Sequence, residues 1–417
     1  MKLQRHGQLS PYFSSVGSAS KTLAKNLSLA IVSVVITLVL LEAVLAVTMI
    51  NTSPDARFID NKGFTYIPHA YYRHTKEGYS EGRFNSHGFR DYERTIEKPS
   101  DVFRILVLGD SYVEALQVQL EDSFTVQLEK LLNAKASSLR FEVLSLGHSG
   151  FGTADEYLRY MNFGVDYKPD LVILAFLTGN DFRNNSRMLN RERINFYYVL
   201  DNHHKLVLDR SLIDGYQESL TLPKRLFQAI KTHSRVLALI SERIYLLNFR
   251  QADAQMEAAG SKSGGSEHQS YSLFSDLNIY RADLPPEWKG AVEITKQIIL
   301  MFKKSVEEHG SRFLLLTLSN AEQVHPEVAD ELRNKYKDNF DFDQPDRLLE
   351  EFARQHQLMF VKLMPDLLKY HLDTRQYLHG FGPTHKGHWN QVGHRRAAEL
   401  TFQFLKDQHI VSLEISG

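Results

Sequence analysis

The stretch Phe103-Arg-Ile-Leu-Val-Leu-Gly-Asp-Ser-Tyr112 decides the fold of this 417-residue chain. Its apolar run follows a charged lead-in and stops at Gly109. A run this short is typical of a buried strand in a parallel sheet, because a helix needs about ten residues or more. Helix-like apolar spacing follows between residues 114 and 133. Ser111 is therefore predicted to lie between the carboxyl end of a strand and a helix, where open α/β sheets bind ligands.

The same pattern of strand, turn and helix occurs twice more along the chain. A second apolar run at 141–146 leads into a glycine-rich turn at 147–152, and a third run at 171–177 ends in Thr-Gly-Asn-Asp. Further strands are predicted at 312–318 and 358–363, with helices around them. Counting these elements predicts an α/β fold with a five-stranded, mostly parallel sheet flanked by helices.

Residues 190–285, between the third and fourth strands, are predicted to form an insertion. Within it, residues 194–209 have the pattern of two strands joined by an Asp-Asn-His-His turn. Residues 222–249 have the spacing of one long amphipathic helix. Residues 251–270 are rich in Ala, Gly, Ser and charge, with little to bury, which predicts a disordered loop.

The N-terminus has the composition of a membrane anchor. Residues 1–26 contain four Lys or Arg and no Asp or Glu, and the apolar run 27–50 is long enough to cross a bilayer. Its one charged residue, Glu42, lies toward the far end. The positive flank predicts a single-pass protein of the cell (inner) membrane, with a cytoplasmic N-terminus and a periplasmic or otherwise extracytoplasmic remainder. The alternative is a cleaved signal peptide, because Val44-Leu45-Ala46 is a passable cleavage pattern.

Composition excludes several kinds of chemistry. The formal net charge is −1, and no basic stripe with interleaved aromatic residues is present, so neither a polyanion nor nucleic acid is an expected partner. The chain contains no Cys, which removes disulfides, thiolate metal sites and cysteine nucleophiles. We expect no cofactor.

A serine nucleophile at the predicted sheet edge needs a base and oxyanion donors from other segments. His388 lies in the loop before the last predicted helix, and that loop can return to the edge that carries Ser111. Taken singly, the candidate residues have ordinary interpretations. Gly-Asp-Ser is a common capped turn, Asn180 a turn residue and Gly150 a glycine at a helix entry.

Taken together and in order, four blocks resemble the SGNH (GDSL-type) hydrolase family over about residues 103–408. They are Gly109-Asp-Ser, Ser149-Gly-Phe-Gly-Thr, Gly179-Asn-Asp and His388-Trp-Asn-x-x-Gly-His. The resemblance implies a flavodoxin-like three-layer α/β/α sandwich over residues 101–410. The polar and aromatic residues 51–100 before it are predicted to form a lead-in segment of short strands and turns. It also implies ester hydrolysis or acyl transfer through an acyl-enzyme.

The resemblance assigns a role to each candidate residue. Ser111 would be the nucleophile and His388 its general base. The Ser111 and Gly150 N–H groups and the Asn180 amide would form the oxyanion hole. Glycine allows close backbone approach, and an amide is a donor without charge, so both residue types suit that role.

The chain departs from the family at the residue that orients the histidine. Family members usually carry an Asp two or three residues before it, but Lys386 and His385 occupy those positions here. Asp366, Asp373 or a backbone carbonyl are the substitutes that the sequence offers. In triad enzymes, loss of the acid costs on the order of 10⁴ in rate.

Two competing sites are weaker. Ser149 stands in Gly-His-Ser-Gly-Phe, which lacks the final glycine of a Gly-x-Ser-x-Gly nucleophile elbow. His385, His388 and His394 have the residue type of metal ligands but no acidic partners nearby, so no metal is expected.

Two functions remain open from the sequence. The first is an outward-facing esterase or O-acyltransferase that acts on acylated small molecules or on acyl groups, such as acetyl, of carbohydrate. The second is a catalytically weak or inactive SGNH-like domain that binds polysaccharide as an anchored assembly component.

Overall fold

The computed structural model describes residues 12–48, 56–59, 63–136, 139–190, 195–203, 205–231, 234–241, 243–244, 247 and 271–411. The chain separates into two compact units. The smaller comprises Met1–Asn51 and Leu222–Asn248, and the larger comprises Thr52–Thr221 and Phe249–Gly417. The loop predicted at 251–270 lies outside the described residues.

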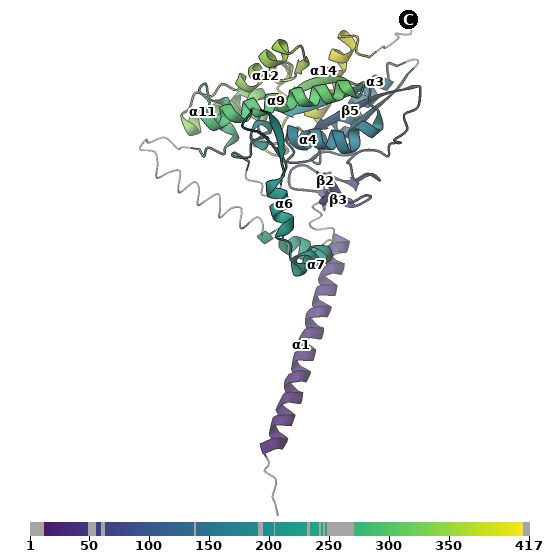
Figure 1. Cartoon of the computed structure of the whole chain (residues 1–417), viewed down its shortest axis with the longest axis vertical. Coiled ribbons are helices and arrows are strands. Elements are labelled where there is room, and N and C mark those ends of the chain that lie inside the picture. The colour runs from purple at the N-terminus through teal and green to yellow at the C-terminus, as the bar shows by residue number, and fades with distance from the viewer. Residues whose placement is uncertain are drawn as a thin grey trace, which may run out of the picture. The chain divides into compact units, whose positions relative to one another are not determined.

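The larger unit is built on a five-stranded sheet with the strand order β11-β10-β7-β5-β6. Figure 1 labels one strand of this sheet, β5, and the helices α3, α4, α9, α12 and α14 around it. Every neighbouring pair of strands is parallel. The strands are β5 (Val102–Gly109), β6 (Arg140–Ser145), β7 (Leu171–Leu177), β10 (Arg312–Leu318) and β11 (Met359–Lys362). The predicted five-stranded α/β fold is confirmed.

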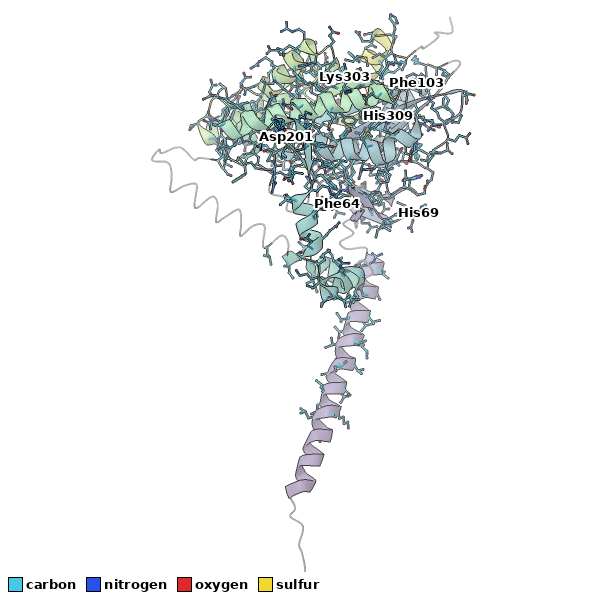
Figure 2. All side chains as sticks on the ribbon, in the orientation of Figure 1. Phe64, His69, Phe103, Asp201, Lys303 and His309 are labelled. Carbon is cyan, nitrogen blue, oxygen red and sulfur yellow. The ribbon has the colours of Figure 1, made fainter. Side chains whose placement is uncertain are left out.

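Two hydrophobic clusters cover the two faces of this sheet, because successive side chains of a strand point to opposite faces. In β5, Leu106 and Leu108 belong to one cluster, and Ile105 and Val107 belong to the other. The first cluster includes side chains from α9 (Pro286–Glu308) and α12 (Gln344–Gln355), and Tyr157 of α4 (Thr153–Arg159) packs against it. The second includes α3 (Phe124–Asn133), α13 (Met364–Thr374) and α14 (Gln391–Asp407). Buried side chains fill both interfaces, which makes the unit a three-layer α/β/α sandwich. Figure 2 draws the side chains on the ribbon.

Several short helices surround the sheet. They are α2 (Ser111–Glu114), α5 (Asp181–Asn184), α10 (Ala321–Val324) and α11 (Pro326–Tyr336). The predicted helix at 114–133 is wrong in its first part. The helix α2 ends at Ala115, which adopts a left-handed φ of 57°, and α3 starts only at Phe124.

The lead-in segment forms two small antiparallel pairs, β1 (Ala56–Ile59) with β2 (Gly63–Tyr66), and β3 (Tyr71–His74) with β4 (Ser80–Arg83). Their side chains form a separate small core with Leu116, which lies just after α2. This core consists of Tyr66, Tyr72, Phe84 and Leu116. The lead-in is therefore packed onto the segment that carries Ser111.

The insertion begins with the predicted hairpin, β8 (Tyr197–Leu200) paired antiparallel with β9 (Leu206–Asp209), followed by α6 (Ser211–Glu218). The single long helix predicted at 222–249 is wrong. The helix α7 (Leu222–Lys231) ends, and a new helix starts at residue 235. Ser234 caps this second helix, since its hydroxyl accepts the N–H of Leu237 at 3.1 Å.

The smaller unit contains α1 (Tyr12–Thr48). Its residues Thr22–Thr48 form a 27-residue stretch that is long and apolar enough to cross a membrane. Apart from Leu45 and Glu42, every side chain of this stretch is exposed.

Candidate active site

Ser111 is the first residue of α2, and Asp110 alone separates it from the end of β5 at Gly109. The side chain of Asp110 caps this helix by accepting the N–H of Tyr112 at 2.9 Å. A Cβ atom at Gly109 would lie 2.4 Å from Val113 Cγ2, so only glycine fits where the strand turns into the helix. The predicted placement of Ser111, between the carboxyl end of a strand and a helix, matches the structure.

The imidazole of His388 reaches Ser111 from the other end of the chain. Its Nε2 atom lies 2.7 Å from Ser111 Oγ. The ring of Tyr112 packs 5.0 Å from the imidazole, and its hydroxyl donates to the carbonyl of Gly387 at 3.2 Å. The carbonyl of His388 accepts the N–H of Gly380 at 2.9 Å. Contacts on several sides thus fix the histidine against the serine.

Glu77 supplies the carboxylate that the histidine loop lacks. Its Oε2 atom lies 2.6 Å from His388 Nδ1, and its Oε1 accepts the backbone N–H of His388 at 2.6 Å. Glu77 belongs to the turn between β3 and β4, 311 positions before His388. The sequence analysis missed it, because the only local signal is an acidic residue beside a glycine in a turn.

Two glycines allow Glu77 to approach. Gly387 has a φ of +100°, and a Cβ atom there would lie 2.1 Å from Glu77 Oε1. Gly78 has a φ of +68°, and a Cβ atom there would lie 2.2 Å from the carbonyl oxygen of Gln117. The same carbonyl accepts the N–H of Tyr79 at 3.1 Å. The turn is therefore pinned to the segment after α2.

Arg90 makes a second connection between the lead-in and that segment. Its buried guanidinium donates to the Tyr72 hydroxyl at 2.8 Å and to the carbonyls of Glu114 at 2.8 Å and Val118 at 2.5 Å. Hydrogen bonds from a charged donor are stronger than neutral ones. The position of Glu77 is thus tied to the position of the helix that carries Ser111.

The substitutes that the sequence offered for the acid do not contact His388. Asp373 accepts a hydrogen bond from Lys369 at 2.5 Å, and Asp366 lies exposed on α13. The two positions where the family carries its Asp also have other partners. Lys386 pairs with Glu331 at 2.6 Å, and His385 stacks on Tyr377 with ring centroids 3.4 Å apart. The expectation that Asp366, Asp373 or a backbone carbonyl orients His388 is therefore wrong, and the group in that position is Glu77.

The electrostatics keep Glu77 ionised. Partial burial raises the pKa of Glu77, but the hydrogen bonds and the charge of His388 outweigh burial and leave the pKa below its ordinary value. Burial acts in the opposite direction on Asp110 and raises its pKa, although the N–H of Tyr112 lowers it in part. Glu77 is therefore the carboxylate placed to face a charged imidazole.

The loop with Gly150 lies against α2. The N–H of Ser149 donates to Glu114 at 2.8 Å, and the Ser149 hydroxyl donates to the same carboxylate. A Cβ atom at Gly147 would lie 2.4 Å from the backbone nitrogen of Glu114. Gly150 itself has a φ of +82°, a conformation that favours glycine. The structure thus brings the second block to the turn that carries Ser111.

Asn180 reaches the same turn from the end of β7. Its Nδ2 atom lies 3.4 Å from Asp110 Oδ2, next to the serine. A Cβ atom at the preceding Gly179 would lie 2.1 Å from the side chain of Asn320, so a larger residue does not fit there. All four predicted site residues, Ser111, Gly150, Asn180 and His388, therefore come to one edge of the sheet.

In the structure, Ser149 and His394, which belong to the two competing sites, have other hydrogen-bond partners. Ser149 donates to the carboxylate of Glu114, which orders the loop. His394 is buried and accepts the N–H of Phe124 on its Nδ1 atom at 3.3 Å, and burial lowers its pKa to about 3. Across the part of the chain that the structure describes, no group of three His, Cys, Asp or Glu residues is placed to hold a metal ion.

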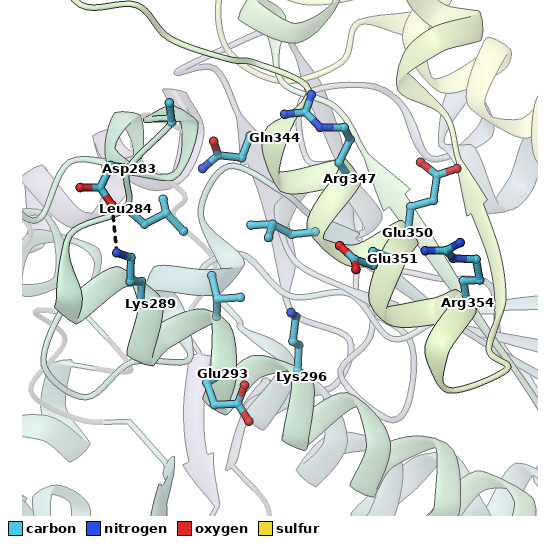
Figure 3. A pocket seen from close by; sticks show the side chains of 13 residues that line it. Asp283, Leu284, Lys289, Glu293, Lys296, Gln344, Arg347, Glu350, Glu351 and Arg354 are labelled. Atoms are coloured by element: carbon cyan, nitrogen blue, oxygen red, sulfur yellow. Dashed lines mark hydrogen bonds and ion pairs between the residues drawn. The ribbon is translucent and has the colours of Figure 1, made fainter.

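A separate pocket of about 960 Å³ lies between α9 and α12 (Figure 3). Its walls carry both signs of charge, with Lys289 paired to Asp283 at 2.9 Å and with Lys296 and Arg347 nearby. None of its lining residues belongs to the Ser111 site.

No protein-family model matches this chain, and a search of curated proteins also finds no match. Solved structures that it resembles include an acetyl xylan esterase, AlAXEase, at 12% identity and a TM-score of 0.38, covering 72% of this chain and 98% of that one. TesA is similar at 13% identity and a TM-score of 0.36, covering 73% and 98%. An acetyl-xylooligosaccharide esterase from Geobacillus, Axe2, is similar at 14% identity and a TM-score of 0.36, and the match covers 73% of this chain and 94% of that one.

Proposed function

We propose that this protein is a membrane-anchored, outward-facing serine esterase or O-acyltransferase of SGNH type that acts on acylated carbohydrate. The observation that carries the proposal is the unbroken series Ser111, His388 and Glu77, joined at 2.7 Å and 2.6 Å. A nucleophile, a base and a group that orients the base are the parts that acyl transfer requires. The carboxylate of Glu77 also removes the main reason to regard the domain as inactive.

The reaction would proceed in two halves. As Ser111 Oγ attacks the ester carbonyl, His388 Nε2 takes the serine proton, and Glu77 stabilises the resulting imidazolium through Nδ1. The N–H groups of Ser111 and Gly150 and the amide of Asn180 would hold the oxyanion. His388 then gives its proton to the leaving alcohol. In the second half, water or an acceptor hydroxyl attacks the acyl carbon and loses a proton to His388. The bond between the acyl carbon and Ser111 Oγ then breaks, and His388 returns the proton to Oγ.

The surroundings of Glu77 suit a carbohydrate substrate. Tyr79, two residues away, is 47% exposed, and the ring of Phe381 borders Gly78 in the same turn. Exposed aromatic rings combine an apolar face with, in tyrosine, a polar tip, which matches the apolar faces and hydroxyl edges of a sugar ring. A short acyl group such as acetyl is the first substituent that we would test.

Labelling with a fluorophosphonate tests the proposal, because only an activated serine reacts quickly. We expect the wild-type protein to be labelled within minutes, and we expect Ser111→Ala and His388→Ala to abolish the labelling. Ser149→Ala tests the competing serine: the label should still go to Ser111, at a reduced rate because the loop with Gly150 loses a hydrogen bond to Glu114. Absence of labelling in the folded wild-type protein would overturn the enzymatic proposal and favour a polysaccharide-binding component.

Acetylated oligosaccharide then separates hydrolysis from transfer. Release of free acetate indicates an esterase, whereas acetyl groups on an added acceptor sugar indicate an acyltransferase. Ser111→Ala should lose either product.

A further inference from the structure

The smaller unit exposes apolar side chains on two further helices besides α1: α7 and the helix that starts at residue 235. On α7 they occupy one helical face at spacings of four, one and three residues, and after the break they recur at spacings of four and three. These residues are 48% to 71% exposed: Leu222, Leu226, Phe227, Ile230, Ile240, Ile244 and Leu247. Two consecutive amphipathic helices that both expose an apolar face indicate a surface that binds a protein or a membrane.

The first turn of the second of these helices is bound by a side chain of α1. The carboxylate of Glu42 accepts the N–H groups of Arg235 at 3.0 Å and Val236 at 3.1 Å, and it also accepts the hydroxyl of Ser234. A helix N-terminus has free N–H groups and a partial positive charge, and a carboxylate satisfies both. The one charged residue of the apolar span therefore has a specific partner.

The position of Glu42 along α1 places this junction at the edge of a bilayer. Residues Thr22–Thr48 number 27, which corresponds to about 40 Å of helix. The hydrocarbon core of a bilayer is about 30 Å thick, so about 10 Å of the helix lies outside the core, divided between the end with Lys25 and the end at Thr48. Glu42 is six residues from Thr48, or about 9 Å along the axis. The helix that it caps thus starts within about two turns of the outer boundary of the hydrocarbon core.

The charge of α7 matches such a location. Its sequence, Leu-Pro-Lys-Arg-Leu-Phe-Gln-Ala-Ile-Lys, contains three cations and no acid. Basic residues opposite an apolar face are the composition of helices that lie in a membrane interface, where cations attract anionic lipids.

From these observations we infer that α7 and the helix that starts at residue 235 lie flat in the interface of the membrane that α1 crosses, with their apolar faces in the acyl boundary. The inference rests on the proposed membrane anchoring. The bilayer is favoured over a protein partner because Glu42 joins the second of these helices to α1, the helix that is long and apolar enough to cross a membrane. The insertion would then form a second, in-plane membrane contact.

Single-cysteine labelling of the full chain tests this inference, since the native sequence contains no Cys. Phe227→Cys and Ile244→Cys report on the two helices, and Val35→Cys reports on the span. Gly290→Cys, on α9 of the larger unit, is the water-exposed control, because a side chain there meets nothing within 4 Å. Each variant carries an NBD fluorophore and is reconstituted into phosphatidylcholine vesicles with one quarter phosphatidylglycerol and with nitroxide lipids.

We expect nitroxides near the headgroups to quench NBD at positions 227 and 244 at least twofold more than at position 290. Nitroxides deep in the acyl chains should quench the label at position 35. Quenching at 35 without quenching at 227 and 244 overturns the in-plane contact and leaves the anchor intact. A label at 35 that is open to aqueous quencher overturns the proposed anchoring itself. Labels at 227 and 244 shielded from both water and lipid indicate a protein partner, which also overturns the inference.

Discussion

At the scale of single residues, Glu77 changes the interpretation of the site. The carboxylate that orients His388 comes from a hairpin turn far upstream, and Gly387 provides the space for it. The resemblance directs attention to the two positions just before the histidine, where Lys386 and His385 stand. Those side chains have partners of their own, Glu331 and Tyr377.

The first prediction concerns the carboxylate. Glu77→Gln keeps the size of the side chain but removes the charge that stabilises an imidazolium, so kcat/KM for p-nitrophenyl acetate should fall on the order of 10²-fold to 10⁴-fold. The loss should appear mainly in kcat, because Glu77 acts through His388. Asp373→Asn is the matched control, since Asp373 pairs with Lys369 on the surface, and it should stay within about twofold. Wild-type kcat/KM in Glu77→Gln together with reduced kcat/KM in Asp373→Asn would show that Asp373, and not Glu77, orients His388.

The second prediction concerns the space beside that carboxylate. Gly387→Ala introduces a methyl group where the Glu77 oxygen now lies, at a φ of +100° that alanine rarely adopts. Displacing Glu77 should lower kcat about as much as Glu77→Gln does. Gly382→Ala is the control in the same loop, because a Cβ atom there meets nothing within 4 Å, and it should retain wild-type rates. Equal activity of the two alanine variants would show that close approach of Glu77 is not required.

At the scale of elements, α14 and α3 are joined by a histidine that must stay neutral. The Nδ1 atom of His394 accepts the N–H of Phe124 at the start of α3, and a protonated imidazole has no acceptor. Trp389 lies buried against the same ring, with centroids 5.6 Å apart. The last histidine of the motif thus joins α14 to the start of α3.

The third prediction is the pH dependence of that joint. Burial lowers the pKa of His394 to about 3, whereas the unfolded chain has a value near 6.5, so the unfolded state binds more protons between these limits. Stability therefore falls as the pH drops from about 6.5 toward 3, by up to about 1.4 kcal/mol per pH unit from this residue. Chemical denaturation between pH 7 and pH 4.5 should show a shallower decline for His394→Gln, whose amide oxygen can still accept the N–H. Parallel declines would contradict the assignment.

At the scale of the whole molecule, much of the fold follows from the sequence. The buried strands are short apolar runs with clear ends, so β7 and β10 occupy the predicted residues. A parallel sheet collects strand ends at one edge, which is why Ser111 and Asn180 meet. The role of Glu77 could not be predicted from the sequence, because its position depends on the packing of the lead-in, through contacts such as that of Arg90 with Glu114. No periodicity or spacing encodes those contacts.

The last prediction follows from the contribution of the lead-in to the site. Residues 101–410 have the length and motifs of a complete domain, yet a fragment that begins at 101 lacks Glu77 and Arg90. We expect the fragment 56–417 to hydrolyse p-nitrophenyl acetate and the fragment 101–417 to lose at least about 10²-fold in kcat/KM, because its histidine has no carboxylate.

Loss of the small core around Leu116 can also unfold the shorter fragment, so circular dichroism and fluorophosphonate labelling accompany the assay. The fragment 56–417 with Glu77→Gln keeps that core and separates the two causes. It should remain as stable as its parent to within about 1 kcal/mol and still lose activity. Full activity in both the folded 101–417 fragment and the Glu77→Gln fragment would show that the lead-in is dispensable for catalysis, and His388 would then have to work without a carboxylate.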